Sequence, residues 1–158
     1  MVRMFRYAES EDGQDFGRTY VLIDGTNGDV SRFTRGRICH SLCIMTGVDG
    51  IAVLEKSADC DFRLRYCDSR GMSVSPSLPS CSSVPWGIAL CAVAFADLLG
   101  IKPFHSKEWD FRWGELALSA RIDSHLGECK SISIFPHSPG SDSSLIRSGN
   151  ALCLGEFE

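Results

Sequence analysis

The chain has 158 residues and a mass of 17.3 kDa, which suits one domain with a single core and excludes two full domains. Its 16 Lys and Arg and 20 Asp and Glu give a net charge of −4, and no basic run is present. This composition lacks the electrostatic footprint of a nucleic-acid-binding protein or of attraction to anionic membranes, so we expect neither partner.

Cysteine usage and hydropathy predict a soluble, cytoplasmic protein. The eight cysteines fall below the roughly 8–10% that marks a disulfide scaffold. They form no Cys-x-x-Cys pair and have no His at a zinc-finger spacing, so we expect free thiols and no metal site. The amino terminus lacks the apolar segment of a signal peptide. The longest apolar run, 84–99, would span only about 24 Å as a helix, short of a bilayer core.

Apolar periodicity predicts four strands and one helix in the first half of the chain. β-branched and aromatic residues mark the first two strands, and a polar turn over 10–17 joins them. In the fourth strand, buried-type Leu64 and Tyr66 alternate with Arg63 and Arg65, which is typical of one buried and one wet face. The expected strands are 2–8, 19–23, 50–55 and 61–67, and the expected helix is 31–44.

A serine-rich segment, 69–83, is predicted to be a loop with at most a short strand at 72–75. A helix is expected directly after it, over 84–99. Asp97 is the one charged residue between Ile88 and Leu99, so this helix must be buried on all sides. In a domain of this size, that requires a helix running through the middle of a curved sheet.

The ends of this helix carry recognisable signals. Ser82 or Ser83 can cap its start, Pro85 fits its first turn, and Gly100 fits just past its end.

The pattern of apolar residues predicts further strands in the second half of the chain. Residues 109–122 are expected to form a strand pair broken at Gly114, and 129–135 another strand. A loop is expected over 136–144. The last segment, 145–158, is either a final strand or a loose tail.

The order of several segments resembles the diaminopimelate epimerase family. The resemblance runs over about 4–135, one half of the family's two-domain chain. It rests on GQDFGRTYVLIDG (13–25), TGVDGIAVLE (46–55), DFRLRYCDSRG (61–71), the apolar helix 84–99 and WGELALSARI (113–122). It implies an α+β fold in which a curved antiparallel sheet or barrel wraps around a central apolar helix. We therefore expect one such domain over 1–158, with its core at about 4–135 and a loop and tail at 136–158.

The resemblance also implies chemistry. The family inverts a carbon centre without a cofactor: one cysteine thiolate removes a proton, and a second cysteine, from the other domain, returns one. The family's cysteine at the start of the central helix corresponds to Cys81 here, where a helix amino terminus lowers a thiol pKa. Cys81 is therefore the catalytic candidate. If the helix is instead aligned through Gly87, Val84 takes that position and no thiol remains there.

Other positions of the resemblance supply substrate-binding candidates. Backbone N–H groups at a helix start can hold a carboxylate or an enolate oxygen. No pair of carboxylates suited to an ammonium group is visible, so we expect that free diaminopimelate is not a substrate and that the ligand is less polar. The candidates are Gln14, Cys67 or Asp68, Ser82, Ser83 and, after the central helix, His105. The aromatic residues Phe104, Trp109, Phe111 and Trp113 are expected to form core and cavity wall.

Three functions remain open at this point. The first is a cofactor-independent isomerase or epimerase that transfers a proton at carbon on a small carbonyl- or carboxylate-containing metabolite. The second is a cyclase or isomerase of specialised-metabolite biosynthesis, and the third is a non-catalytic small-molecule-binding protein. Because the family builds its site between two similar halves, we expect this chain to form a homodimer.

Overall fold

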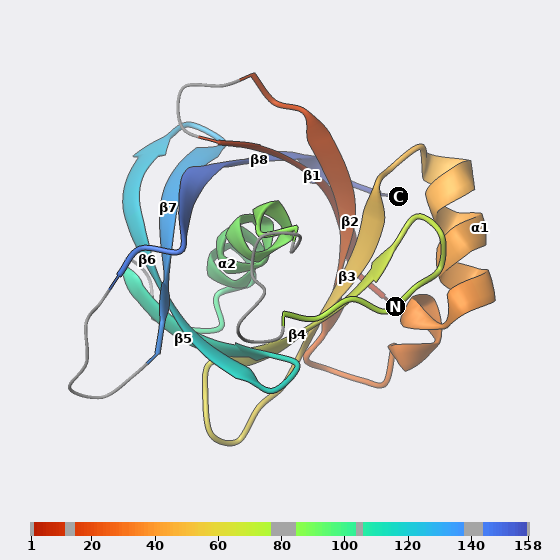
Figure 1. Cartoon of the computed structure of the whole chain (residues 1–158), viewed down its shortest axis with the longest axis horizontal. Coiled ribbons are helices and arrows are strands. Elements are labelled where there is room, and N and C mark those ends of the chain that lie inside the picture. The colour runs from red at the N-terminus through yellow and green to blue at the C-terminus, as the bar shows by residue number, and fades with distance from the viewer. Residues whose placement is uncertain (1, 12–14, 77–84, 104–105, 138–143, 158) are drawn as a thin grey trace.

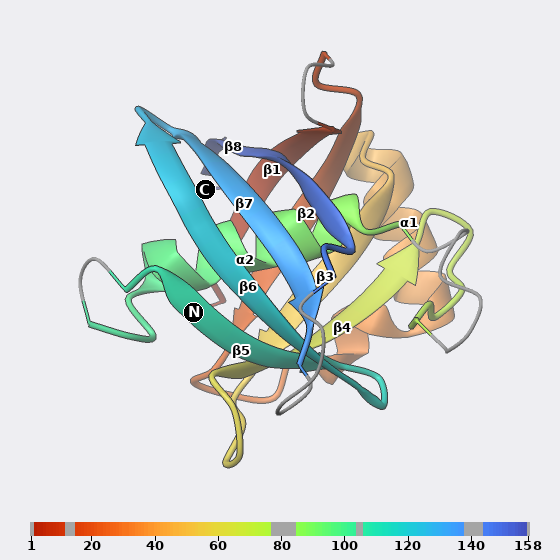
Figure 2. The same ribbon diagram turned by 60° about the vertical axis from the view of Figure 1, so that its left-hand side comes forward.

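A helix, α2 (Gly87–Leu99), runs through the inside of a closed eight-stranded barrel in the computed structural model (Figures 1 and 2). The structure describes residues 2–11, 15–76, 85–103, 106–137 and 144–157. The strands are β1 (Met4–Glu11), β2 (Arg18–Gly25), β3 (Gly50–Glu55), β4 (Phe62–Asp68), β5 (Glu108–Trp113), β6 (Leu116–Leu126), β7 (Cys129–Pro136) and β8 (Arg147–Glu156). They neighbour one another in chain order, and β8 closes the barrel on β1.

The strands expected from apolar periodicity are confirmed, with ends that differ by a few residues. The pair broken at Gly114 is the hairpin of β5 and β6, and Gly114 sits there with a φ of 62°. The short strand considered at 72–75 is reduced to a single bridge between Cys67 and Ser73. The segment left open between strand and tail is β8, which pairs with both β1 and β7. The barrel core therefore continues past residue 135, because it cannot close without β8.

The expected antiparallel sheet contains two parallel pairs, β2 with β3 and β4 with β5. In each case a helix connects the paired strands. The helix α1 (Gly36–Thr46) crosses outside the barrel and α2 crosses through it. A crossover of this kind returns the chain to the same end of the sheet, so the next strand runs parallel to the last.

The central helix is buried as its composition predicts. Every residue from Gly87 to Ala96 is buried. Small side chains, four of them alanines, keep the diameter of the helix small. Phe95 packs against the rings of Phe5 and Tyr7 at centroid distances of 5.3 and 5.9 Å. Gly100 ends the helix with a φ of 70°, as expected. Its start differs from the prediction: the N-cap residue is Trp86, whose side chain makes no capping hydrogen bond.

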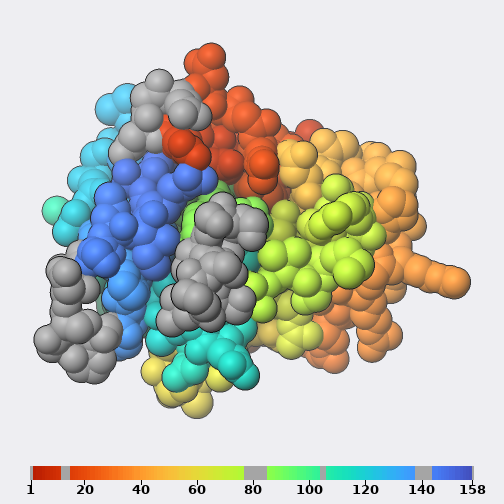
Figure 3. Space-filling view, in the orientation of Figure 1, coloured from red at the N-terminus to blue at the C-terminus, as the bar shows by residue number. Residues whose placement is uncertain are grey.

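A second layer covers the outer face of one side of the barrel. The helix expected over 31–44 is split into a 3₁₀ turn, Ser31–Thr34, and α1, because Arg35 between them is extended (φ −74°, ψ 137°). Cys39 and Cys43 of α1 pack with outward-facing apolar residues of β2 and β3. Figure 3 shows α1 (orange) beside segment 69–75 (yellow-green), where His40 Nδ1 lies 2.9 Å from the Ser69 carbonyl oxygen. Strand β3 is thus buried on both faces, which explains its unbroken apolar run.

In the described ranges, no helix is long and apolar enough to cross a membrane. The same ranges contain no group of three or more His, Cys, Asp or Glu side chains placed to hold a metal ion.

Candidate functional site

The strand ends that surround the first turn of α2 form the candidate site, here named the helix-start end of the barrel. Strands β1 and β8 meet there through an ion pair between Glu11 and Arg147. Glu9 pairs in register with Arg18 of β2. These residues come from the two ends of the described chain, and barrel closure brings them together.

Glu9 is a buried carboxylic acid on the inner face of the barrel. The inner positions of β1 alternate as Phe5, Tyr7 and Glu9; the first two contact Phe95, near the far end of α2. Glu9 instead lies against Gly87, the first residue of α2: a Cβ placed on Gly87 would lie 2.6 Å from Glu9 Oε1. Only 8% of Glu9 is exposed. The absence of a side chain at Gly87 is therefore what gives the carboxyl group its place at the helix start.

The surroundings of Glu9 favour its protonated form. Burial raises the pKa of the Glu9 carboxyl above its usual value, while the nearby charges of Arg147 and Arg18 oppose this and those of Glu11 and Asp49 add to it. Together these effects raise the pKa of Glu9. A carboxyl group with a raised pKa is better matched to proton transfer near neutral pH than an ordinary surface glutamate.

Arg147 supplies a hydrogen-bond donor at the same end. Its Nη1 donates to a carboxylate oxygen of Glu11. Its Nε is buried and has no hydrogen-bond partner among the described residues. A buried N–H without a partner is costly. The missing acceptor makes this N–H a candidate donor to an oxygen of a ligand.

Aromatic rings line the barrel beside these charged groups. Tyr20, Tyr66, Trp113 and Trp86 form a chain of edge-to-face contacts, with successive centroid distances of 5.9, 6.3 and 5.7 Å. All four are buried. The expectation that the described aromatic residues 109, 111 and 113 form core is confirmed. The site thus combines a carboxyl group and a guanidinium group with an apolar wall.

Most of the residues singled out from the sequence lie outside the described part of the chain. These are Gln14, Cys81, Ser82, Ser83 and His105.

The other two sequence candidates are described, and both lie away from α2. Cys67 is fully buried in the layer under α1, where its carbonyl accepts a hydrogen bond from the Cys39 thiol at 3.5 Å. Asp68 holds the turn that follows β4: its Oδ1 accepts the backbone N–H groups of Arg70 and Met72, each at 3.0 Å. This placement gives Cys67 a packing role and Asp68 a turn-forming role.

The described cysteines are all free thiols. Cys91, in the middle of α2, is fully buried, and burial raises its pKa well above the ordinary value. Burial also raises the pKa of Cys39 and Cys43. Thiols of this kind stay protonated and serve as small apolar side chains.

Glu9 and Arg147 were not identified from the sequence. For Glu9 a signal exists: the alternation Phe5, Tyr7, Glu9 places an acid on the inner face of a strand. The expected strand ends at residue 8 and the expected turn begins at residue 10, so neither prediction includes Glu9. Arg147 carries no such signal, since its segment was ambiguous between strand and tail.

Comparisons with known proteins support the fold. No protein-family model and no curated protein matches the chain. Among solved structures, it is similar to a phenazine biosynthesis protein of the PhzF family from Bacillus anthracis (13% identity, TM-score 0.59) and to a predicted epimerase from Pseudomonas aeruginosa (12%, 0.60). The likeness covers 85% of this chain in both cases, but only 40% and 43% of those chains.

A methylitaconate-delta-isomerase is similar over 99% of this chain and 95% of its own, with 10% identity and a TM-score of 0.54. At such identities the likeness establishes a shared fold. The expected α+β barrel around a central helix is confirmed, and the chain spans less than half the length of the first two proteins.

The contact between Glu9 and Gly87 can be tested with a double-mutant cycle. Replacing Gly87 by Ala forces a methyl group into the buried carboxyl, and we expect the free energy of unfolding to fall by about 1–3 kcal/mol. In a Glu9→Ala background the same change should cost nothing or stabilise by up to about 1 kcal/mol, because Ala is the better helix former.

Urea denaturation measures all four corners of the cycle. Gly28→Ala is the control, since a Cβ there meets nothing within 4 Å. An equal cost for Gly87→Ala in both backgrounds would contradict the contact.

Proposed function

We propose that this protein is a cofactor-independent, isomerase-type enzyme that moves a proton at carbon on a small metabolite containing a carbonyl or carboxylate group. The observation that carries the proposal is the buried Glu9 carboxyl at the first residue of α2, at the same end of the barrel as the Arg147 Nε–H, which has no hydrogen-bond partner among the described residues. Proteins described as an isomerase and a predicted epimerase share this fold, which supports the same class of reaction.

The proposed reaction needs a base and an oxyanion donor. In its ionised form Glu9 takes a proton from the carbon next to the substrate carbonyl. The electron pair of that C–H bond moves to the carbonyl oxygen, which accepts a hydrogen bond from Arg147 Nε–H. The enolate then regains a proton at carbon, on the other face or at another position. The raised pKa of Glu9 reduces the difference between its basicity and that of the substrate carbon.

Inversion at one carbon needs a second proton-transferring group. Cys81 remains our proposal for this role, because it precedes α2 by a few residues in the chain. Gln14, Ser82, Ser83 and His105 are proposed to contact the substrate on the same grounds of position in the chain.

A second candidate function is a cyclase or isomerase of specialised-metabolite biosynthesis. The aromatic chain from Tyr20 to Trp86 favours it, because such a wall suits a planar, apolar substrate. The similar fold of a phenazine biosynthesis protein supports it as well. A cyclisation driven by shape should survive Cys81→Ser, whereas a two-base inversion should not.

Proton transfer at carbon can be tested by exchange in deuterated water. Small 2-keto acids, unsaturated dicarboxylates and diaminopimelate are incubated with the protein, and deuterium entering carbon is followed by NMR. We expect exchange next to a carbonyl or carboxylate group in at least one of the first two classes, and none in diaminopimelate.

Glu9→Gln should slow this exchange by about 100-fold or more, because the amide cannot accept the proton. The control is Glu108→Gln, which changes an exposed glutamate of β5 and should leave the rate unchanged. Exchange that survives Glu9→Gln would assign the base elsewhere.

We also propose that the chain acts as a homodimer, since the resembling family completes its site with a second, similar half. Sedimentation at micromolar concentration should give about twice the chain mass of 17.3 kDa. A stable monomer with full exchange activity would contradict this.

A further inference from the structure

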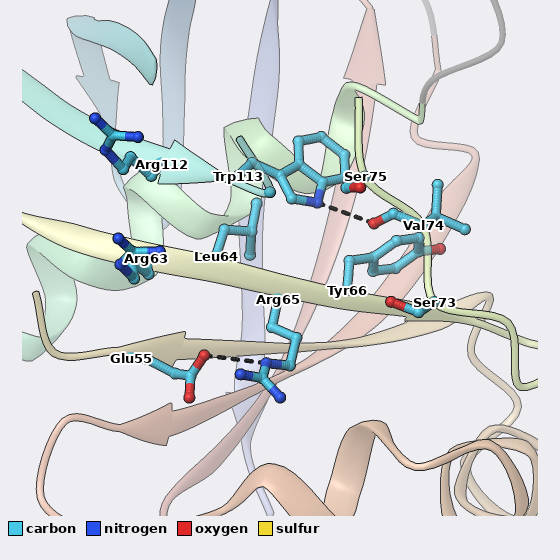
Figure 4. A pocket seen from close by; sticks show the side chains of 11 residues that line it. Glu55, Arg63, Leu64, Arg65, Tyr66, Ser73, Val74, Ser75, Arg112 and Trp113 are labelled. Atoms are coloured by element: carbon cyan, nitrogen blue, oxygen red, sulfur yellow. Dashed lines mark hydrogen bonds and ion pairs between the residues drawn. The ribbon is translucent and has the colours of Figure 1, made fainter. Parts of the chain in front are cut away.

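A hollow of about 210 Å³ opens on the outer wall of the barrel between β4 and β5 (Figure 4). These strands pair over only three residues each, 62–64 with 111–113. Beyond that point the segment 73–75 lies between the two strands. Val74 N–H donates to the carbonyl of Tyr66 in β4, and the Nε1–H of Trp113 in β5 donates to the Val74 carbonyl. The strands therefore separate and leave a space whose lining includes neither Glu9 nor Arg147.

Three arginines line this hollow, which we call the arginine hollow. Arg63 of β4 and Arg112 of β5 are direct partners in the register of the sheet. Like charges at directly opposed positions destabilise a sheet. Arg65 lies two residues further along β4, on the same face as Arg63. The arrangement therefore concentrates positive charge on a protein whose net charge is −4.

Neighbouring carboxylates only partly neutralise this charge. Arg65 Nε lies 3.1 Å from Glu55 Oε1, and Arg112 Nε lies 3.6 Å from Asp59 Oδ2. Within the described ranges, Arg63 makes no ion pair of its own at 4.0 Å or less. Three guanidinium groups thus share two carboxylates: Arg63 has no ion pair of its own among the described residues, and its charge acts, with that of Arg112, on Asp59.

Hydrogen-bond donors remain available in the hollow. Each guanidinium has five N–H donors, and the two ion pairs occupy few of them. The hydroxyl groups of Ser73 and Ser75 line the same space. Paired guanidinium groups match the oxygens of a phosphate, which carries nearly two negative charges at neutral pH. A volume of about 210 Å³ is below the roughly 300 Å³ at which pockets for drug-sized ligands begin, so only a small group fits.

We propose that the arginine hollow binds the phosphate group of a small metabolite between Arg63 and Arg112, with Arg65, Ser73 and Ser75 beside it. The bound dianion relieves the repulsion between the two opposed arginines. The hollow shares Tyr66 and Trp113 with the aromatic chain of the helix-start end of the barrel, but neither Glu9 nor Arg147 lines it, and phosphate binding there does not depend on the function proposed for those two residues.

Inorganic phosphate is the probe for the test. It is titrated into ¹⁵N-labelled protein at constant ionic strength, and the Arg Nε–H signals and the Ser73 and Ser75 amides are followed by NMR. We expect saturable shifts at these groups, and none when sodium chloride replaces phosphate. Arg63→Gln and Arg112→Gln should each weaken binding by at least about fivefold. Arg37→Gln, an exposed arginine of α1, is the matched control and should bind as the unmodified protein does.

A stability measurement separates loss of binding from loss of folding. Without phosphate, Arg63→Gln should be at least as stable in urea as the unmodified protein, because one of two opposed like charges is gone. Phosphate should then raise the urea midpoint of the unmodified protein more than that of the variant. Shifts that do not saturate, equal shifts with chloride, tighter binding of succinate than of phosphate, or equal weakening by Arg37→Gln would each overturn the proposal.

Discussion

Burial of a helix that has no polar face is the constraint on which the rest of this structure depends. Ten consecutive residues of α2 are buried, and the one charged residue of the helix, Asp97, lies near its end, where it pairs with Lys130 at 2.6 Å. Exposing large apolar side chains costs about 1.5–3 kcal/mol each, so the helix needs cover on every side. Alanines along the helix make it slim enough for eight strands to close around it.

The position of the helix determines where chemistry can occur. Inner positions of β1 step along α2 from Phe5 and Tyr7, which face Phe95, to Glu9, which faces Gly87. Every second residue of β1 points inward, so Phe5 and Tyr7 are followed on the same face by Glu9, which lies at the first residue of α2. An ionisable group held in an otherwise apolar interior conflicts with the local rules of core packing, and such conflicts are typical of functional sites. The candidate site therefore depends on which residues of β1 lie beside which residues of the central helix.

Local patterns were enough to predict the strands and the burial of α2, because both depend on periodicity along a short segment. The two parallel pairs were not predictable in this way, since direction depends on whether a connection crosses the barrel. Residue Cys67 shows a second limit. It follows Tyr66, an inner residue, so it faces outward, and only the position of α1 shows that this outer face is also buried. Strand β8 was ambiguous because its polar and apolar residues fit a tail as well as a strand, and Arg147 was missed with it.

The barrel interior holds the Glu9 carboxyl in surroundings that favour its protonated form. The most direct test is a ¹³C NMR titration of the Glu9 side-chain carboxyl, assigned by the loss of its signal in Glu9→Gln. We expect a midpoint above the ordinary value of 4.5, because burial outweighs the opposing charges of Arg147 and Arg18. A midpoint at or below 4.5 would show that the carboxyl is solvated or firmly ion-paired, and that the barrel interior does not favour its protonated form.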